Sequence, residues 1–222
     1  MANFTYLVSL KFPNTPSPKY ISNLGMGHEV IGIDLLPSSI NDKNYTHYIA
    51  DVSKKNTLPN IKDVEIIFNN AGKQNDHDIA NNLVGSMNVT EKYAFQNKIK
   101  SVLFNASASA RSGFEFPEYV ASKAGLVGYM KNVAVRLAEF GATANSISLG
   151  GVLTESNAPV MEDEESWNQI MEATPLKKWA TLNEVSEWVY FLTVINKSAS
   201  GQDILIDNGE FNLNSTFVWP KR

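Results

Sequence analysis

The sequence predicts an α/β fold of the Rossmann-like, doubly wound type: a mostly parallel seven-stranded sheet with helices on both faces. Short β-branched runs alternate with longer amphipathic stretches, and this alternation favours right-handed crossovers and a parallel sheet. The 222 residues with 43% apolar content match the size of one large domain. No long Pro- or Ser-rich linker divides the chain, so we expect residues 1–222 to form a single domain.

The predicted elements follow one another from the N-terminus. Seven short apolar runs are predicted as strands: Thr5–Leu10, Glu29–Ile33, Tyr45–Ile49, Val64–Phe68, Val102–Asn105, Ala144–Leu149 and Asp203–Ile206. Five stretches with apolar residues at intervals of three and four are predicted as helices: Lys19–Met26, Ile79–Gln96, Pro117–Phe140, Glu162–Glu172 and Leu182–Val194. Thr181 and Glu184 form a capping-box pattern before the last helix. Gly141 is suited to end the long helix before it.

Composition excludes several classes of function. The net charge of −4, with scattered basic residues, argues against a nucleic-acid partner. No membrane span or signal peptide is indicated, and the absence of cysteine fits a cytoplasmic protein. His28, His47 and His77 lack the spacing of metal ligands, so no metal site is expected and each histidine is interpreted as a surface or turn residue.

Tyr119 and Lys123 form the first candidate for chemistry. They stand four residues apart near the start of a predicted helix, so their side chains share one face. A phenol has an ordinary pKa near 10, and a neighbouring ammonium stabilises the phenolate. The pair is therefore a plausible acid/base unit at neutral pH.

Other segments in their expected order resemble the short-chain dehydrogenase/reductase family. Asn69-Asn70-Ala71-Gly72 after a strand resembles the family's Asn-Asn-Ala-Gly segment, whose residues Asn70, Ala71 and Gly72 would line the cofactor. The stretch from Pro175 to Gly209 resembles the family's C-terminal part, most closely the branch of the 3-oxoacyl-carrier-protein reductases. The resemblance implies an oxidoreductase that transfers hydride between NAD(H) and a secondary alcohol or ketone. Tyr119 would be the acid/base and Lys123 would lower the pKa of Tyr119. Both residues would also contact the cofactor.

Two further catalytic residues are implied by the resemblance. The family has a serine about thirteen residues before the tyrosine, and Ser107 precedes Tyr119 by twelve. Ser109 remains an alternative, and two other registers place alanine there, Ala106 or Ala108. Asn82 resembles the family's helix asparagine in the proton relay to the lysine.

The cofactor would be a nicotinamide dinucleotide. Asp34 ends a predicted strand where a carboxylate can accept the hydrogens of a ribose diol and repel a 2′-phosphate, which favours NAD over NADP. Asp51, before Val52, resembles the family's adenine-contacting residue. The alternative for both Asp34 and Asp51 is a turn-forming aspartate. Thr154 resembles the threonine near the nicotinamide.

The family's glycine-rich phosphate loop is missing. Its positions fall on Ser9, Leu10, Asn14 and Pro16, and such glycines normally let the backbone approach a pyrophosphate. Cofactor binding could then be weak or altered, with Asn14 or Ser17 contacting phosphate.

Two other functions remain open. Haloalcohol dehalogenases resemble this family without its glycine-rich loop, but they carry arginine in place of Lys123. A catalytically decayed scaffold is the second alternative. The partners expected are a small-molecule substrate and further copies of the chain, as a homodimer or homotetramer formed through the two long helices, 79–96 and 117–140.

Overall fold

The computed structural model describes residues 4–9, 28–74, 77–114, 116–211 and 213. The predicted helix Lys19–Met26, together with Leu10, Asn14, Pro16 and Ser17, lies outside these residues.

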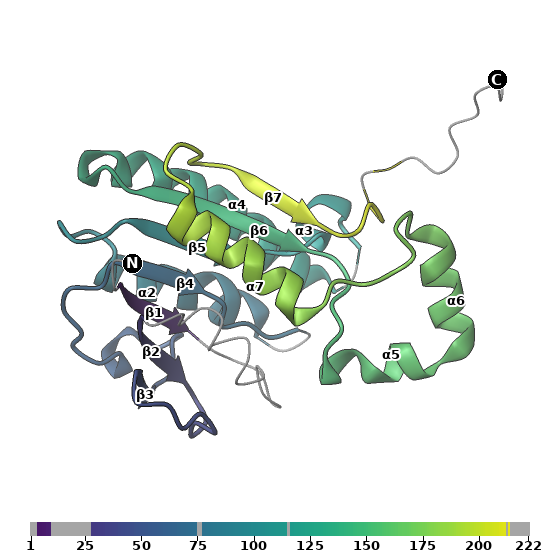
Figure 1. Cartoon of the computed structure of the whole chain (residues 1–222), viewed down its shortest axis with the longest axis horizontal. Helices are drawn as coiled ribbons and strands as arrows, with labels where there is room; N and C mark the ends of the chain where they lie inside the picture. Colours follow the sequence, from purple (N-terminus) through teal and green to yellow (C-terminus); the bar gives the residue numbers. More distant parts are fainter. Residues whose placement is uncertain (1–3, 10–27, 75–76, 115, 212, 214–222) are drawn as a thin grey trace.

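Seven strands form one sheet in which every ladder is parallel (Figure 1). The strand order is β3-β2-β1-β4-β5-β6-β7. The strands are β1 (Thr5–Ser9), β2 (Glu29–Asp34), β3 (Tyr45–Ile49), β4 (Ile66–Asn69), β5 (Ser101–Asn105), β6 (Thr143–Leu149) and β7 (Asp203–Ile206). The order reverses between β1 and β4, as in doubly wound folds, so the predicted fold class is confirmed.

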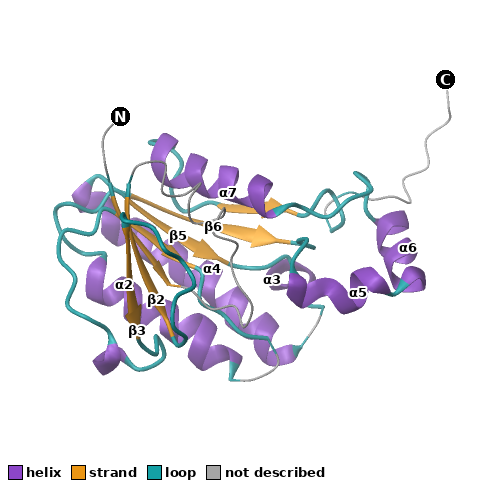
Figure 2. Cartoon of the chain, turned by 60° about the horizontal axis from the view of Figure 1, so that its bottom comes forward, coloured by secondary structure: helices purple, strands orange, loops and turns teal. Residues whose placement is uncertain are grey.

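Helices cover both faces of the sheet (Figure 2). The helical elements are η1 (Lys55–Thr57), η2 (Ile79–Val84), α2 (Gly85–Tyr93), α3 (Ser109–Ser112), α4 (Pro117–Leu137), η3 (Ala138–Phe140), η4 (Glu155–Asn157), α5 (Ala158–Glu162), α6 (Glu164–Ala173), α7 (Leu182–Tyr190) and η5 (Phe191–Ile195). One apolar core packs α2 and α4 against the sheet, and a second packs α7 against the opposite face. Strand residues alternate between the two cores: Leu7 and Ile67 face the first, Val8 and Ile66 the second.

Both helix boundaries read from local chemistry are confirmed. The Thr181 side chain accepts from the Glu184 N–H, and the Glu184 carboxylate accepts in return from the Thr181 N–H at 2.8 Å. Gly141 has φ 65°, and this left-handed conformation ends the long helix.

Three predicted helical stretches are confirmed as helical but differ from the prediction in turn type, end point or continuity. The stretch predicted as Ile79–Gln96 begins with the π-helical turn η2 and ends at Tyr93. The stretch predicted as Leu182–Val194 also ends in a π-helical turn, η5. The stretch predicted as Glu162–Glu172 is divided, because Asp163 takes an extended conformation between α5 and α6 and caps α6 by accepting from the Ser166 N–H.

His28 is a buried side chain, which corrects its interpretation as a surface or turn residue. Its Nδ1 accepts a hydrogen bond from the Phe4 N–H at 3.2 Å, and its ring lies 5.1 Å from that of Tyr6. Burial lowers the pKa of His28, since the charged imidazolium loses hydration, although Glu65 acts in the opposite direction.

We therefore expect stability to fall as the pH drops below the ordinary histidine pKa of about 6.5. In that range the unfolded chain binds a proton that the native His28 does not, so the free energy of unfolding decreases until the lower native pKa is passed. Urea unfolding between pH 7.5 and 5.0 measures this slope. A His28→Asn variant should show a shallower slope, whereas His77→Asn, which alters an exposed histidine, should match the native protein. Equal slopes in all three proteins would contradict the assignment.

Candidate active site

The candidate site lies at the carboxyl ends of the central strands, where a doubly wound sheet presents its loops to ligands (Figure 2). Asn70, Ala71 and Gly72 follow β4, and Ser107 follows β5. Tyr119 and Lys123 lie in the first two turns of α4, which begins with Pro117 at a position that proline favours. Three separate stretches of sequence thus meet at one edge of the sheet.

Lys123 is buried beside Tyr119. The residue is 4% exposed. Its ammonium donates to the Asn105 carbonyl oxygen at 2.7 Å and lies 5.6 Å from the centroid of the Tyr119 ring. Gly72 provides the space for this arrangement, because a Cβ there would lie 3.1 Å from Asn82 Oδ1 and 3.6 Å from Lys123 Nζ. The phenol ring and the ammonium are therefore held as neighbours, with Tyr119 itself only partly buried.

Asn82 connects the loop after β4 to α4. Its Oδ1 accepts from the Lys73 N–H at 2.7 Å, and its Nδ2 donates to the Lys73 oxygen at 2.9 Å and to Ser122 Oγ at 3.0 Å. Ser122 in turn donates to the Tyr119 carbonyl oxygen. The Asn82 carbonyl accepts from Ser86 Oγ at 2.7 Å. Asn82 is fully buried within the π-helical turn, so its bonds fix η2 against α4.

Ser107 and Ser109 form a hydroxyl pair. Ser107 Oγ accepts from the Ser109 N–H at 3.2 Å and from the Ser109 hydroxyl at 2.8 Å. Their neighbours Ala106 and Ala108 donate backbone N–H groups to β6, at Ile147 and Leu149. Because Ser107 Oγ already accepts two hydrogen bonds, its own O–H can act as a donor toward a substrate oxygen.

The residues that would hold a nicotinamide dinucleotide have suitable chemistry. Asn70 Nδ2 and Asn105 Oδ1 are buried without a partner among the described residues, while Asn70 Oδ1 accepts from Asn105 Nδ2 at 2.8 Å. Buried polar atoms of this kind need a partner, and an amide-bearing ligand would supply one. Ser9 Oγ accepts from the backbone N–H groups of Asn70 and Ala71. The residues at the carboxyl ends of β1, β4 and β5 therefore fit a nicotinamide dinucleotide.

Asp34 and Asp51 lie together at the outer end of this edge. Ala50 donates its N–H to the Asp34 carbonyl at 2.8 Å, and Asp34 Oδ1 accepts from the Leu36 N–H at 3.0 Å. The Asp51 carboxylate accepts from the Ser53 N–H and hydroxyl and pairs with Lys54 at 3.1 Å. Partial burial raises the pKa of Asp51, but the bonds from Ser53 and Lys54 outweigh it and the net pKa lies below its usual value. Asp51 thus stabilises its own turn.

Thr154 lies on the other side of the site, after β6. Its hydroxyl is 2.9 Å from that of Ser156, immediately before the one-turn helix η4. The segment that follows leads into α5 and α6, which project beyond the carboxyl ends of β6 and β7 (Figure 1).

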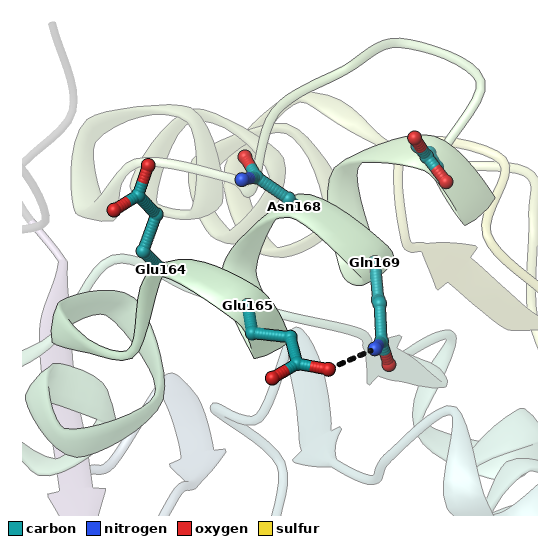
Figure 3. Close-up of a pocket in the computed structure, with 5 residues that line it drawn as sticks. Glu164, Glu165, Asn168 and Gln169 are labelled. Carbon is teal, nitrogen blue, oxygen red and sulfur yellow. Dashed lines mark hydrogen bonds between the residues drawn. The ribbon is translucent and has the colours of Figure 1, made fainter.

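A hollow on α6 includes none of the candidate site residues (Figure 3). It is lined by Glu164, Glu165, Asn168, Gln169 and Glu172, all from one helix. Gln169 donates to Glu165 at 3.4 Å, and the other side chains are exposed to solvent. The first turn of α6 is thus a solvated, acidic helix start.

The described ranges contain neither a candidate metal site nor a membrane-spanning helix. No three histidine, aspartate or glutamate side chains gather there as a metal site. In that part of the chain, none of the helices has the length and apolar character needed to cross a bilayer.

Comparison with known proteins identifies the family. A family model described as Enoyl-(Acyl carrier protein) reductase matches residues 67–210. The (+)-borneol dehydrogenase 1 of Salvia officinalis is 30% identical over 199 residues, which cover 80% of this chain and 75% of that protein. The chain belongs to the short-chain dehydrogenase/reductase family. It is accordingly an oxidoreductase.

Two other similarities agree with this assignment. The 3-oxoacyl-(acyl-carrier-protein) reductase FabG of Staphylococcus epidermidis is 26% identical over 174 residues, covering 71% of this short-chain dehydrogenase/reductase and 70% of FabG. The structure of a 4-hydroxyisoleucine dehydrogenase complexed with NADH covers 96% of this chain and 100% of its own, with a TM-score of 0.83 and 21% identity. The latter similarity concerns the fold.

Three structural contacts at or near the candidate site were not predicted from the sequence. Ser9 was noted only as the first position of the missing glycine-rich loop, yet its hydroxyl holds the loop after β4. Ser122 stands inside the Tyr-x-x-x-Lys motif, and its position between two motif residues was the available signal. Trp179 packs so closely on Gly151 that a Cβ there would lie 2.1 Å from the ring; no local pattern announces this long-range contact.

Proposed function

We propose that this short-chain dehydrogenase/reductase transfers hydride between NAD(H) and a secondary alcohol or ketone, with Tyr119 as acid/base. The observation that supports the proposal most strongly is the buried Lys123 ammonium, fixed by Asn105 beside the Tyr119 ring. A buried ammonium favours an ionised phenol nearby, because the attraction between the two charges is only weakly screened by water.

The residues of this chain would perform the proton transfer. NADH, when bound, supplies the hydride to the substrate carbonyl carbon. Ser107 donates a hydrogen bond to the carbonyl oxygen, and Tyr119 Oη delivers the proton to that oxygen, leaving a phenolate beside Lys123. In the oxidation direction the same phenolate removes the hydroxyl proton. Asn82 keeps the loop after β4 and the first turns of α4 in register.

The cofactor residues proposed are Asp34, Asn70, Ala71, Gly72, Thr154 and the Tyr119–Lys123 pair, with Asp51 as a turn-forming support. We assign Asn70 and Asn105 to the nicotinamide end, because each has one buried amide atom without a partner among the described residues, and the carboxamide of the cofactor would supply that partner. Substrates of the 3-oxoacyl thioester class are proposed first, since the relatives include a 3-oxoacyl-(acyl-carrier-protein) reductase.

Calorimetric titration with NADH, followed by an acetoacetyl-thioester reduction assay, tests the function. Binding and NADH oxidation are expected. No binding at millimolar NADH would refute the redox function. Halide release from a vicinal haloalcohol would instead support the dehalogenase alternative, and a biological role unaffected by Tyr119→Phe would support the scaffold.

Asp34 is expected to set the preference for NADH over NADPH. The Asp34→Ala variant should bind NADH roughly 10- to 100-fold more weakly, the loss expected for a charged hydrogen bond of about 1.5–3 kcal/mol. Its affinity for NADPH should not fall in parallel, because the carboxylate that repels a 2′-phosphate is removed. Titration with both cofactors measures the ratio. An Asp42→Ala variant serves as control, since Asp42 is an exposed carboxylate before β3; an unchanged ratio in Asp34→Ala would contradict the assignment.

We also propose a cytoplasmic homo-oligomer assembled through the α2 and α4 side of the molecule. Exposed apolar side chains on η2, α2 and α4 support it: Ile79, Val84, Met87 and Val135. Size-exclusion chromatography with light scattering is the measurement, and a monomer at micromolar concentration would contradict the proposal.

A further inference from the structure

An ion pair between Arg111 and Asp203 lies next to the Ser107–Ser109 hydroxyl pair in the sequence of contacts. Arg111, in the one-turn helix α3, extends to Asp203 at the start of β7. Its Nε and a terminal nitrogen lie 2.9 and 2.7 Å from Asp203 Oδ2, and the terminal nitrogen also donates to the Asp203 carbonyl oxygen at 2.6 Å. A planar guanidinium with several simultaneous bonds restricts both partners in orientation.

The Asp203 carboxylate is itself held from the other side. Its Oδ1 accepts from Ser146 Oγ at 2.7 Å and from Ser148 Oγ at 2.8 Å. Both serines are fully buried on β6 and project from the same face of the strand. Asp203 therefore cannot turn with Arg111, and the ion pair connects α3 to β6 and β7 at one edge of the sheet.

Helix α3 needs such a connection. It has four residues and ends at Gly113, whose φ is 73°. One helical turn is unstable without outside contacts, because it fixes several residues for few hydrogen bonds. The first residue of α3 is Ser109, which supplies both donors to Ser107 Oγ. A displacement of α3 would consequently move the hydroxyl that orients the substrate.

We propose that Arg111 and Asp203 are positioning residues of the reductase, which act by holding α3 so that Ser109 aligns Ser107. The proposal rests on the function proposed above, in which Ser107 donates to the substrate oxygen. Neither residue touches the reacting atoms. Their effect passes through the backbone of α3 and the Ser109 hydroxyl.

The first experiment compares Arg111→Ala with Arg111→Ala/Asp203→Asn. Arg111→Ala should lower kcat for acetoacetyl-CoA reduction roughly 10- to 100-fold, the scale expected when a reacting group is slightly misplaced. The Kd for NADH should not change. The single variant leaves a largely buried carboxylate without its cation, so its Tm should also fall. The double variant removes that charge but keeps the acceptor for Ser146 and Ser148, and it should regain Tm while kcat stays low.

The second experiment repeats Arg111→Ala in a Ser107→Ala background. If the effect passes through Ser107, kcat should not fall further there. Arg111→Lys keeps the positive charge but lacks the planar guanidinium that makes several bonds at once. It should therefore retain more activity than Arg111→Ala. Lys98→Ala is the control, since it removes one cation from a surface ion pair with Asp63, near the opposite ends of the strands.

Hydrogen exchange tests the effect of the ion pair without turnover. Amides 110–113, bonded back to residues 107–109, should exchange faster in Arg111→Ala and in Arg111→Ala/Asp203→Asn. Unchanged kcat, an equal loss in the Ser107→Ala background, or unchanged exchange of these amides would each overturn the positioning role. A native enzyme that binds NADH but reduces no ketone would remove the proposed function itself, and the catalytic part of this inference with it.

Discussion

Replacing Tyr119 by phenylalanine is expected to lower kcat roughly 10²- to 10⁴-fold, the range by which positioned acid/base groups accelerate proton transfer. The change removes one oxygen atom. The acid that delivers a proton to the substrate oxygen would then be lost, although the hydrogen bond from Ser107 would remain. The phenyl ring would keep its position beside the Lys123 ammonium. The Tm should therefore stay near the native value, and the Kd for NADH should rise by at most about tenfold, the loss expected for one hydrogen bond to the cofactor.

Steady-state kinetics over a range of pH provides the measurement. Native kcat should exceed that of Tyr119→Phe at each pH tested. Tyr129→Phe is a matched control on the same helix, because it also removes one hydroxyl, the one that donates to Glu91 at 2.8 Å. Comparable activity of Tyr119→Phe and Tyr129→Phe would rule out Tyr119 as the acid/base.

Replacing Asn82 by alanine is expected to cost about 2–4 kcal/mol of unfolding free energy. Three side-chain hydrogen bonds are lost, at about 1 kcal/mol each, and the polar groups of Lys73 and Ser122 lose partners in a poorly hydrated region. Activity should fall as well, because Asn82 and Ser122 connect the loop carrying Gly72 to the backbone of Tyr119.

Urea unfolding and kcat under native conditions measure the two effects of Asn82→Ala separately. Asn81→Ala is the neighbouring control, because Asn81 is half-buried in the same turn and its amide donates one hydrogen bond among the described residues, to the His77 carbonyl. The Asn81 change should cost less than about 1 kcal/mol, the value of one ordinary hydrogen bond. Equal losses in the two variants would contradict the structural role assigned to Asn82.

Local patterns predicted much of the fold because they depend on neighbours in sequence. The strands Tyr45–Ile49 and Asp203–Ile206 have their predicted bounds, and the capping box of Thr181 and Glu184 forms as read. The π-helical turns could not be read, since apolar periodicity barely distinguishes them from an α-helix. The buried position of His28 was also invisible, because its contacts are with Phe4 and Tyr6, more than twenty residues away.

The same division applies to the site. The sequence by itself determined that Tyr119 and Lys123 share one helix face, because a spacing of four residues does so in any α-helix. It also determined, through its family resemblance, which residue types to seek. Only the tertiary structure decided that Lys123 turns to Asn105 and that Arg111 reaches Asp203. Those contacts join residues from different strands and helices, and their partners are selected by the packing of the sheet rather than by spacing along the chain.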